Sequence, residues 1–242
     1  MNKKKITLSA HFKKLFLTIT KPLQKLFFSN SSEYWKNRYR KGGNSGSGSF
    51  GKLAEYKASF LNDFAMINNI KQVIEFGCGN GQQSKLYQFN RYIGLDVSES
   101  AITQSIKEFE NSNEHAFFVY NSMAFSDRVE VFKSDLAISI DVIYHLIEDE
   151  IYNKYIEDLF NSSYQWVVIY SSNTLEPTSL PHVKHRLFQE DIKLKFPDWE
   201  FIRQEANPVY QNTEQLETAH ACFFIYKKIT ANNSQINMQN HN

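Results

Sequence analysis

The fold of this 242-residue chain is decided by the stretch Val73-Ile74-Glu75-Phe76-Gly77-Cys78-Gly79-Asn80-Gly81. Its first four residues are mostly apolar and predict a short buried strand. Glycines then occupy every second position, and a backbone needs glycine where φ must be positive or where a ligand approaches the main chain. From Gln82 onward the pattern is compatible with a helix. A strand that runs through a tight glycine turn into a helix is typical of a loop that binds a nucleotide cofactor.

Beyond this stretch, β-rich runs alternate with helical patterns. The expected strands are 72–77, 91–96, 115–120, 135–141 and 164–171, and the expected helices are 81–89, 99–111, 148–160 and 184–195. This alternation predicts a doubly wound α/β fold with a mostly parallel sheet and helices on both faces. Two further strands, 200–204 and 222–227, have no helix between them and predict a C-terminal antiparallel hairpin. The sequence therefore predicts a single seven-stranded sheet.

Charge is unevenly distributed along the chain. The formal net charge is only +1, yet residues 1–41 contain eleven Lys or Arg against the single acid Glu33. The rest of the chain carries 16 basic and 25 acidic residues. The formal net charge is therefore +10 for residues 1–41 and −9 for the residues that follow. Two cysteines are too few for a disulfide framework, which indicates a reduced, cytoplasmic setting.

Apolar residues recur at steps of three and four between residues 6 and 28, which predicts a basic amphipathic helix kinked at Pro22. Such a helix can lie in the headgroup region of an anionic membrane, here at the inner face. Docking on the domain itself or on a partner is the alternative. His11, Lys13 and Lys14 interrupt the apolar stretch that a cleaved signal peptide needs, and no run is long enough to span a bilayer.

The glycine loop departs from the dinucleotide fingerprint G-x-G-x-x-G, because Gln82 stands where the third glycine is required. Instead, Glu75-x-Gly77-x-Gly79-x-Gly81 resembles the first motif of class I S-adenosylmethionine (SAM)-dependent methyltransferases. The resemblance extends through the order of strands over residues 50–228. It implies SAM as the cofactor, whose small zwitterionic methionine end reaches main-chain N–H and C=O groups only where side chains are missing.

The resemblance also implies roles for single residues. Glu75 would attract the cationic end of the cofactor, and Asp96 would accept both ribose hydroxyls with its two carboxylate oxygens. Asp96 has an alternative role as a helix N-terminal acid, since Ser98 and Glu99 follow it. Asn121 matches the position near the adenine amino group. The residues expected to bind the cofactor are Glu75, Gly77, Cys78, Gly79, Gly81, Asp96, Val97 and Asn121.

After the fourth expected strand, the run Asp141-Val142-Ile143-Tyr144-His145-Leu146 resembles the post-strand motif of small-molecule O-methyltransferases. It lacks both prolines of the N/D-P-P-Y/F signature of enzymes that methylate planar amines in nucleic acid, which disfavours a nucleic-acid acceptor. A hydroxyl acceptor must be aligned behind the methyl group and must lose a proton to a base. The candidates for this base are Asp141, His145, His182 and His185.

Basic residues are dense in the run Pro181-His182-Val183-Lys184-His185-Arg186, after the fifth expected strand. That position belongs to the carboxyl edge of the sheet, where open α/β folds bind ligands. The run suits an anionic acceptor such as a phosphate, a uronic acid or a glycan phosphodiester, and a solvated helix start is the alternative. No carboxylate pair accompanies His182 and His185, so no metal site is expected.

Ahead of the core, residues 33–41 resemble the Tyr-Trp-x-x-Arg-Tyr entry helix found before many SAM-binding cores, whose side chains close over the cofactor or acceptor. If so, the glycine- and serine-rich residues 42–51 form a lid. Packing of the aromatic residues on the core is the alternative. The residues expected at the substrate and the lid are Tyr34, Trp35, Arg38, Gly46, Ser47 and Arg186.

These patterns divide the chain into four parts: a basic amphipathic segment (1–30), an aromatic helix with a lid loop (31–52), a methyltransferase domain (53–229) and a disordered tail (230–242). The expected function is transfer of a methyl group from SAM to a hydroxyl or phosphate oxygen of a small-molecule or glycan-like acceptor. The alternatives are a non-catalytic SAM-binding interaction module and a nicotinamide-dependent oxidoreductase.

Overall fold

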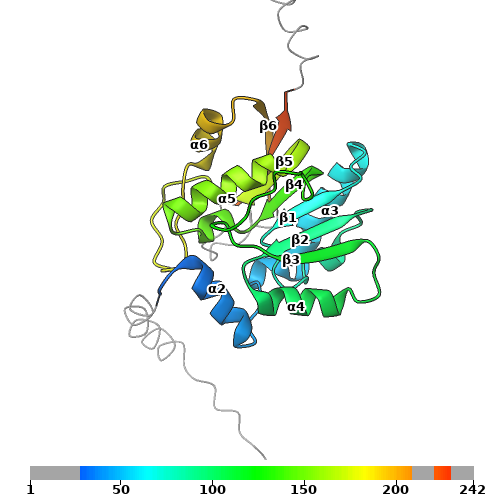
Figure 1. Cartoon of the computed structure of the whole chain (residues 1–242). Coiled ribbons are helices and arrows are strands. Elements are labelled where there is room, and N and C mark those ends of the chain that lie inside the picture. The colour runs from blue at the N-terminus through cyan, green and yellow to red at the C-terminus, as the bar shows by residue number, and fades with distance from the viewer. Residues whose placement is uncertain (1–27, 209–220, 230–242) are drawn as a thin grey trace, which may run out of the picture.

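The computed structural model describes residues 28–208 and 221–229 (Figure 1). The predicted tail 230–242, and all but the last three residues of the predicted amphipathic segment 1–30, lie outside the described residues. The first half contains α2 (Ser31–Arg40), η1 (Ser47–Ser49), α3 (Gly51–Ile67), β1 (Val73–Phe76), η2 (Ser84–Leu86), β2 (Tyr92–Asp96), α4 (Glu99–Glu108) and β3 (His115–Val119). The second half contains β4 (Ser134–Ile140), η3 (Ile143–His145), α5 (Asp149–Asn161), β5 (Ser163–Ser171), α6 (Phe188–Lys195), β6 (Trp199–Ala206) and β7 (Cys222–Lys228).

The seven strands form one sheet in the order β3-β2-β1-β4-β5-β7-β6. The first five strands pair in parallel, and β7 pairs antiparallel with both β5 and β6. The predicted doubly wound sheet and its C-terminal antiparallel hairpin are therefore confirmed. Parallel pairing brings the carboxyl ends of β1 to β5 to a common edge of the sheet.

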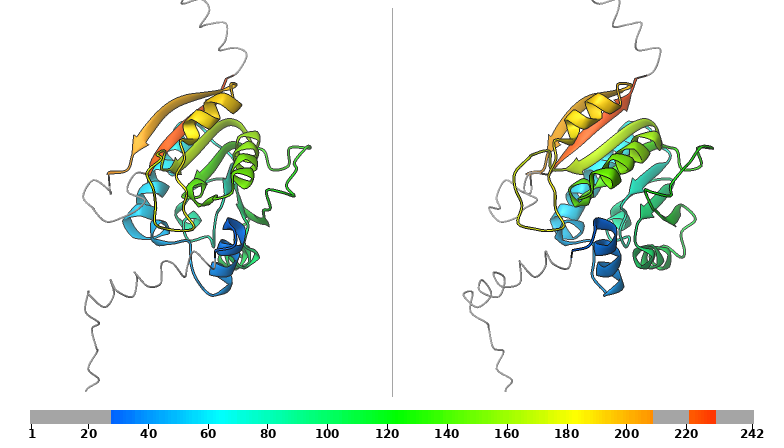
Figure 2. Two further views of the ribbon diagram at one scale, coloured as in Figure 1. Left: turned by 90° about the vertical axis from the view of Figure 1, so that its left-hand side faces the viewer. Right: turned by 60° about the vertical axis from the view of Figure 1, so that its left-hand side comes forward.

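Helices cover both faces of the sheet (Figure 2). Side chains alternate along each strand, so Val73 of β1 packs with α3 in one core cluster, and its neighbour Ile74 packs with α5 in the other. Burial on both faces explains why the central strands read as nearly continuous apolar runs. Within the described residues, no helix is both long and apolar enough to cross a membrane.

The predicted helix 81–89 is wrong. Only the short η2 turn forms there, after which the chain becomes extended at Tyr87 (φ −80°, ψ 148°). Tyr87 and Phe89 are both buried and both pack near Tyr92. Residues two apart point the same way only in extended chain, so burial of this aromatic pair excludes a helix.

The predicted helix 184–195 starts four residues late, at Phe188. The backbone N–H of Lys184 donates to the Tyr144 carbonyl at 2.8 Å, so residues ahead of α6 run alongside the segment that follows β4. We call residues 172–187, which connect β5 to α6, the strap.

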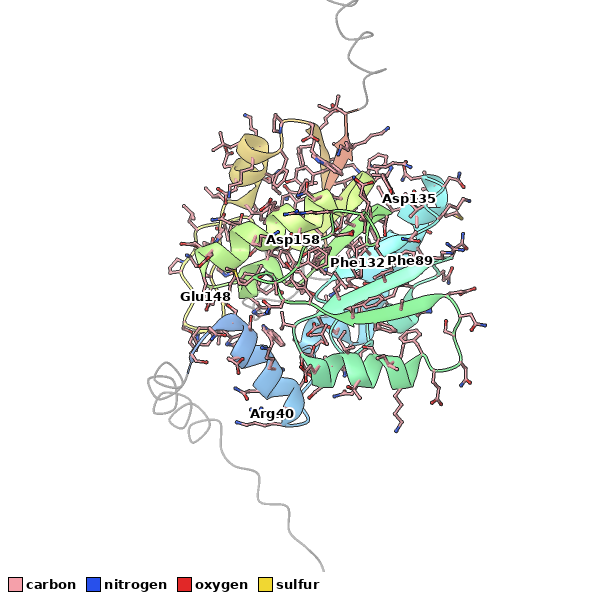
Figure 3. All side chains as sticks on the ribbon, viewed as in Figure 1. Arg40, Phe89, Phe132, Asp135, Glu148 and Asp158 are labelled. Atoms are coloured by element: carbon pink, nitrogen blue, oxygen red, sulfur yellow. The ribbon has the colours of Figure 1, made fainter. Side chains whose placement is uncertain are left out.

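Helix α2 is anchored at its first turn. Its N-cap Asn30 accepts the Glu33 backbone N–H at 2.8 Å, the usual way to satisfy a free helix N–H. Ser31 donates its backbone N–H and its hydroxyl to Glu148, at 3.0 and 2.5 Å. Figure 3 shows Glu148 beside the start of α2, with Arg40 at the other end of the helix. These bonds fix α2 to the start of α5.

Candidate active site

A cavity lies at the carboxyl edge of the parallel strands. Gly77 follows β1, Val97 follows β2, Tyr120 follows β3 and Asp141 follows β4, and all four line the cavity. Open α/β sheets bind ligands at this edge, because the loops after the strands converge there. Residues of α2 and of the Gly/Ser-rich loop also line it, namely Ser31, Ser32, Trp35, Tyr39, Ser45 and Ser49.

The glycine loop after β1 has a backbone that side chains would not tolerate. Gly77, Gly79 and Gly81 have φ angles of 83°, 61° and 80°, in the left-handed region that favours glycine. A Cβ at Gly77 would clash with the side chain of Val142, and one at Gly79 would lie 2.7 Å from the Tyr39 hydroxyl oxygen. Glycine is therefore required for the loop's conformation and for close packing on its backbone.

Asp96 ends β2 and is buried beside the glycine loop. Its Oδ2 accepts the backbone N–H of Gly79 at 3.0 Å, and its Oδ1 accepts that of Ser98 at 2.8 Å. Burial raises the pKa of this carboxyl to about 6, although both N–H groups act to lower it. Each carboxylate oxygen keeps a second lone pair, so Asp96 can also accept hydrogen bonds from a ligand in the cavity.

Glu75 lies on β1, lines the cavity and is almost completely buried. Its carboxyl accepts hydrogen bonds from the hydroxyls of Tyr92 and Tyr87. Burial raises its pKa to about 7, and the two tyrosine hydroxyls and nearby Lys57 reduce that rise. The predicted acid thus lies at the site, but its carboxyl already accepts hydrogen bonds from protein groups.

Gln83 is a lining residue that the sequence pattern missed. Its side-chain amide donates to the Ala54 carbonyl at 2.9 Å, which assigns the other terminal atom as the carbonyl oxygen. That buried Oε1 accepts no hydrogen bond from the described residues. An unpaired buried acceptor is costly, and its presence in the cavity wall fits a ligand with N–H or O–H donors, such as the methionine end of SAM.

Other predicted cofactor contacts differ in position. Cys78 and Val97 line the cavity, and Gly81 packs on Ser105 of α4. The Asn121 side chain accepts the Met123 backbone N–H at 3.1 Å and is exposed, whereas Ser122 lines the cavity. The structure therefore brings Ser122, more than Asn121, to the wall near the end of β3.

His145 is the predicted base candidate with the clearest geometry. It lines the cavity, and its ring lies edge to face with Trp35 at 4.8 Å. Its Nδ1–H donates to the main-chain carbonyl of His182 at 2.9 Å. A carbonyl only accepts, so Nδ1 carries the proton and Nε2 carries the lone pair. Burial lowers the pKa of His145 to about 4, which keeps the ring neutral at physiological pH.

Asp141 also lines the cavity, but protein groups occupy both of its oxygens. Oδ1 accepts the Tyr144 hydroxyl at 2.8 Å, and Oδ2 pairs with Lys57, which is buried in α3 and lies over the Tyr170 ring. The residue has a positive φ of 60°, a strained conformation for a residue with a side chain. This arrangement holds the carboxylate as an ion-pair partner, with both oxygens already in contact with protein groups.

The basic run of the strap binds protein groups. Arg186 donates to the carbonyls of Leu146 and Ile147 and to Asp149, at 2.5, 3.0 and 2.8 Å. Lys184 donates to the same Asp149 oxygen at 2.6 Å, and together the two bases lower the pKa of Asp149 to about 2.

The two strap histidines lie beside the cavity and are not lining residues. His182 supplies the carbonyl that anchors His145, and the Nδ1 of His185 hydrogen-bonds the Ser172 hydroxyl at 2.6 Å. Within residues 28–208 and 221–229, no group of three His, Cys, Asp or Glu residues is arranged to hold a metal ion.

The Gly/Ser-rich loop is held against the glycine loop. The Tyr39 hydroxyl hydrogen-bonds Ser45 Oγ at 2.7 Å, and Ser45 donates to Asn80 at 3.2 Å. At the loop's other end, a Cβ on Gly48 would lie 3.0 Å from Asp141 Oδ2. The loop therefore rests on the site at two places.

The predicted lid and entry-helix residues occupy different positions around this loop. Trp35 lines the cavity, and Arg38 donates from Nε to the Asn44 carbonyl at 2.6 Å, which ties α2 to the loop. Gly46 has a φ of 94° ahead of the η1 turn, and Ser47 is exposed at the start of that turn. Ser45 and Ser49, in place of Gly46 and Ser47, are the loop residues that line the cavity.

Known proteins resemble this chain in structure and not in sequence. No protein-family model matches the sequence, and no curated protein matches it significantly. Among solved structures, the methyltransferase domain of bacterial CtHen1-C is 19% identical, with a TM-score of 0.59 over 74% of this chain and 100% of that one. The chain has the class I SAM-dependent methyltransferase fold.

Two further structures share the methyltransferase fold and were solved with cofactor or product bound. The N-methyltransferase NodS from Bradyrhizobium japonicum, in complex with S-adenosylhomocysteine (SAH), is 12% identical with a TM-score of 0.60, covering 83% of this chain and 99% of its own. Magnesium protoporphyrin IX methyltransferase from Synechocystis, with bound SAM, is 14% identical with a TM-score of 0.55, covering 93% and 100%.

Proposed function

We propose that this protein is a SAM-dependent O-methyltransferase in which His145 removes the acceptor proton. The observation that carries the proposal is the His145 side chain, whose protonated Nδ1 is anchored on the His182 carbonyl while the basic Nε2 belongs to a ring in the cavity wall. A neutral imidazole at a ligand site is suited to general-base catalysis.

The cofactor half of the proposal is supported by the methyltransferase fold and by donors and acceptors in the cavity. Asp96 offers carboxylate lone pairs where the resemblance expects the ribose, and Gln83 offers an unpaired carbonyl oxygen. Bound SAM would supply a methyl group activated by the positive sulfonium. Asp96, Gln83 and the main chain of the glycine loop would hold it.

The reaction is an in-line displacement. With SAM bound, the acceptor oxygen would form a bond to the methyl carbon as the carbon–sulfur bond breaks, and the bonding pair would stay on sulfur, giving SAH. The hydroxyl proton moves to Nε2 of His145 and is later released to water. The protein therefore contributes alignment of the acceptor and removal of its proton.

The lining favours an uncharged hydroxyl acceptor over a phosphate. Among the described residues that line the cavity there is no Lys and no Arg. The nearby bases Lys184 and Arg186 are paired with Asp149. An anion placed in this cavity would be desolvated without a cation to compensate it. We therefore propose a small-molecule or glycan-like acceptor that is neutral where it enters the cavity.

The test combines binding and turnover. Isothermal titration calorimetry should show binding of SAM and SAH and no binding of NAD. Binding of NAD would instead support the nicotinamide-dependent alternative. Transfer of label from [methyl-³H]SAM is then measured for a catechol, a methyl hexoside and a hexose phosphate. We expect labelled product from a neutral acceptor and none from the phosphate. Tight SAM binding without transfer to a broad panel of acceptors would instead support a non-catalytic SAM-binding module.

The pH profile provides a second test of the base. A base works in its deprotonated form, so kcat should rise as pH increases through the His145 pKa of about 4 and stay level from about pH 6 to 8. Saturating SAM is needed, because the pKa of Asp96 near 6 would also change cofactor binding in acid. A kcat that rises with an apparent pKa near 6.5 would contradict a His145 base whose pKa is lowered to about 4.

A membrane surface is a separate proposal for residues 1–30. Its support is the basic amphipathic sequence pattern alone. Deleting residues 1–30 should abolish retention on liposomes that contain anionic lipid, at low ionic strength. Undiminished retention would remove the membrane proposal without affecting the proposed chemistry.

A further inference from the structure

Tyr34 lies next to the site without lining the cavity. Its ring stacks on the imidazole of His182 in the strap, with ring centroids 4.5 Å apart and planes 10° from parallel. Its hydroxyl accepts a long hydrogen bond from Arg38, at 3.4 Å. At this point α2 contacts the strap through the stack of the two rings.

His182 in turn contacts His145. Its main-chain carbonyl accepts the Nδ1–H of His145 at 2.9 Å, and the two imidazoles lie nearly parallel at 5.5 Å. Two residues further along the strap, the Lys184 backbone N–H donates to the Tyr144 carbonyl. Arg186 then donates to the carbonyls of Leu146 and Ile147. The strap is thus bonded to the segment 144–147 at successive positions, and the anchor of His145 is the first of them.

We propose that Tyr34 is a positioning residue, which holds His182 so that its carbonyl fixes the orientation and tautomer of His145. This inference rests on the proposed role of His145 as the base. Tyr34 acts through His182 and touches no reacting atom.

The physical reason is that a histidine base works only when the correct nitrogen is deprotonated. The free ring exchanges between two tautomers, and the partner of one nitrogen decides which tautomer is held. The Arg186 and Lys184 bonds secure the strap downstream of His182, whereas the stack on Tyr34 secures it at His182 itself. Losing the stack would free the carbonyl to move away from Nδ1.

Several charged or titratable groups surround His145 and bear on its protonation. They are Arg38 from α2, His182 from the strap, and Asp141 on the preceding loop. Tyr144 and Trp35 contribute uncharged rings against the imidazole. Tyr34 also lies edge to face with Trp35, at 5.4 Å, and Trp35 contacts His145. The His182→Ala variant leaves both of these contacts in place, so it separates the route through His182 from a route through Trp35.

The experiment reads the tautomer directly and needs no acceptor. The full-length protein is labelled with ¹⁵N-histidine, and long-range ¹H–¹⁵N spectra are recorded, with His145→Gln used to assign the His145 signals. In the wild type, we expect Nδ1 to be protonated and the ring not to titrate between pH 5 and 8. Tyr34→Phe keeps the stack and should preserve both properties. Tyr34→Ala should give a mixture of tautomers and titration closer to the ordinary range of histidine.

His182→Ala is the second variant, because it removes the ring of the stack and keeps the main-chain carbonyl. It should reproduce the Tyr34→Ala spectrum, and it decides the question if Tyr34→Ala does not fold. A folded Tyr34→Ala or His182→Ala protein that keeps His145 wholly in the Nδ1–H tautomer would overturn the proposal.

Activity then separates this proposal from the proposed function. For an active wild type, Tyr34→Ala should lower kcat about 10- to 100-fold with little change in the KM for SAM, as expected for a misplaced catalytic group, and Tyr34→Phe should restore it. If the wild type transfers no methyl group, the proposed function fails, while the tautomer measurement still tests the role of Tyr34.

Discussion

The two ends of the cavity are built differently. The proposed cofactor end is made from residues that directly follow neighbouring strands, such as Gly77 after β1 and Val97 after β2. The proposed acceptor end is lined by Trp35 of α2 and His145 of η3, and His182 of the strap lies beside it, so its parts are distant in sequence. At the first end local sequence and strand order place the groups, and at the second the packing of separate segments places them. Substitutions should therefore separate cofactor binding from turnover.

The largest expected effect is at the acceptor end. His145→Ala removes the proposed base and should lower kcat about 1000-fold, within the range measured for general-base catalysis. The affinity for SAH should stay within about twofold, because His145 is not expected to touch the cofactor. The matched control is His115→Ala, since His115 packs on Phe109 and does not line the cavity. If His145→Ala lowers the SAH affinity as much as it lowers kcat, the two ends of the cavity do not act separately.

The next effect is at the cofactor end. Asp96→Ala removes the carboxylate that accepts the Gly79 and Ser98 N–H groups, and should weaken SAH binding about 100-fold through lost charge-assisted hydrogen bonds. Calorimetric titration with SAH measures it.

Asp135 is a matched control for Asp96, because it also accepts two backbone N–H groups, those of Lys71 and Gln72. Figure 3 shows it far from Glu148 and the start of α2. Asp135→Ala should lower the thermal midpoint and leave the Kd of SAH unchanged. A similar rise in Kd for both variants would mean that Asp96 acts only through stability.

A smaller effect is expected where the Gly/Ser-rich loop meets the acceptor end. Gly48→Ala places a Cβ 3.0 Å from Asp141 Oδ2, which should displace the loop and lower kcat/KM about 10-fold. Lys52→Ala, an exposed substitution just beyond the loop, is the control. Unchanged steady-state kinetics of Gly48→Ala, with an unchanged thermal midpoint, would show that closure of this loop is not needed for turnover.

The smallest effect is expected in the strap. Lys184 is partly exposed and paired with the exposed Asp149, so Lys184→Ala should change the free energy of unfolding by no more than about 0.5 kcal/mol. Turnover of a neutral acceptor should stay within about twofold, because the Lys184 ammonium does not line the cavity. The same assay is repeated with a hexose phosphate. A tenfold loss of turnover with the hexose phosphate alone would support the anionic acceptor that the sequence predicted.

Sequence patterns predicted the sheet better than the segments that pack around it. The alternation of strands and helices predicted the sheet and its antiparallel hairpin, because burial on both faces leaves a strong apolar pattern. The helix 81–89 was predicted from the helix-compatible pattern after the glycine turn, and burial of Tyr87 and Phe89 prevents it. Gln83 left no signal, since its role depends on contact with Ala54 of α3.

By itself, the sequence determined the sheet and the glycine loop, together with Asp96 at the end of β2. These features depend on backbone conformation and on short spacing, which are written locally in the chain. Only the tertiary structure decided which charges are available at the site. It paired Lys57 with Asp141, which lies 84 residues away, and it bound Arg186 to carbonyls and to Asp149. A charged side chain acts on a ligand only if no protein group satisfies it first, and that depends on which distant groups meet in the fold.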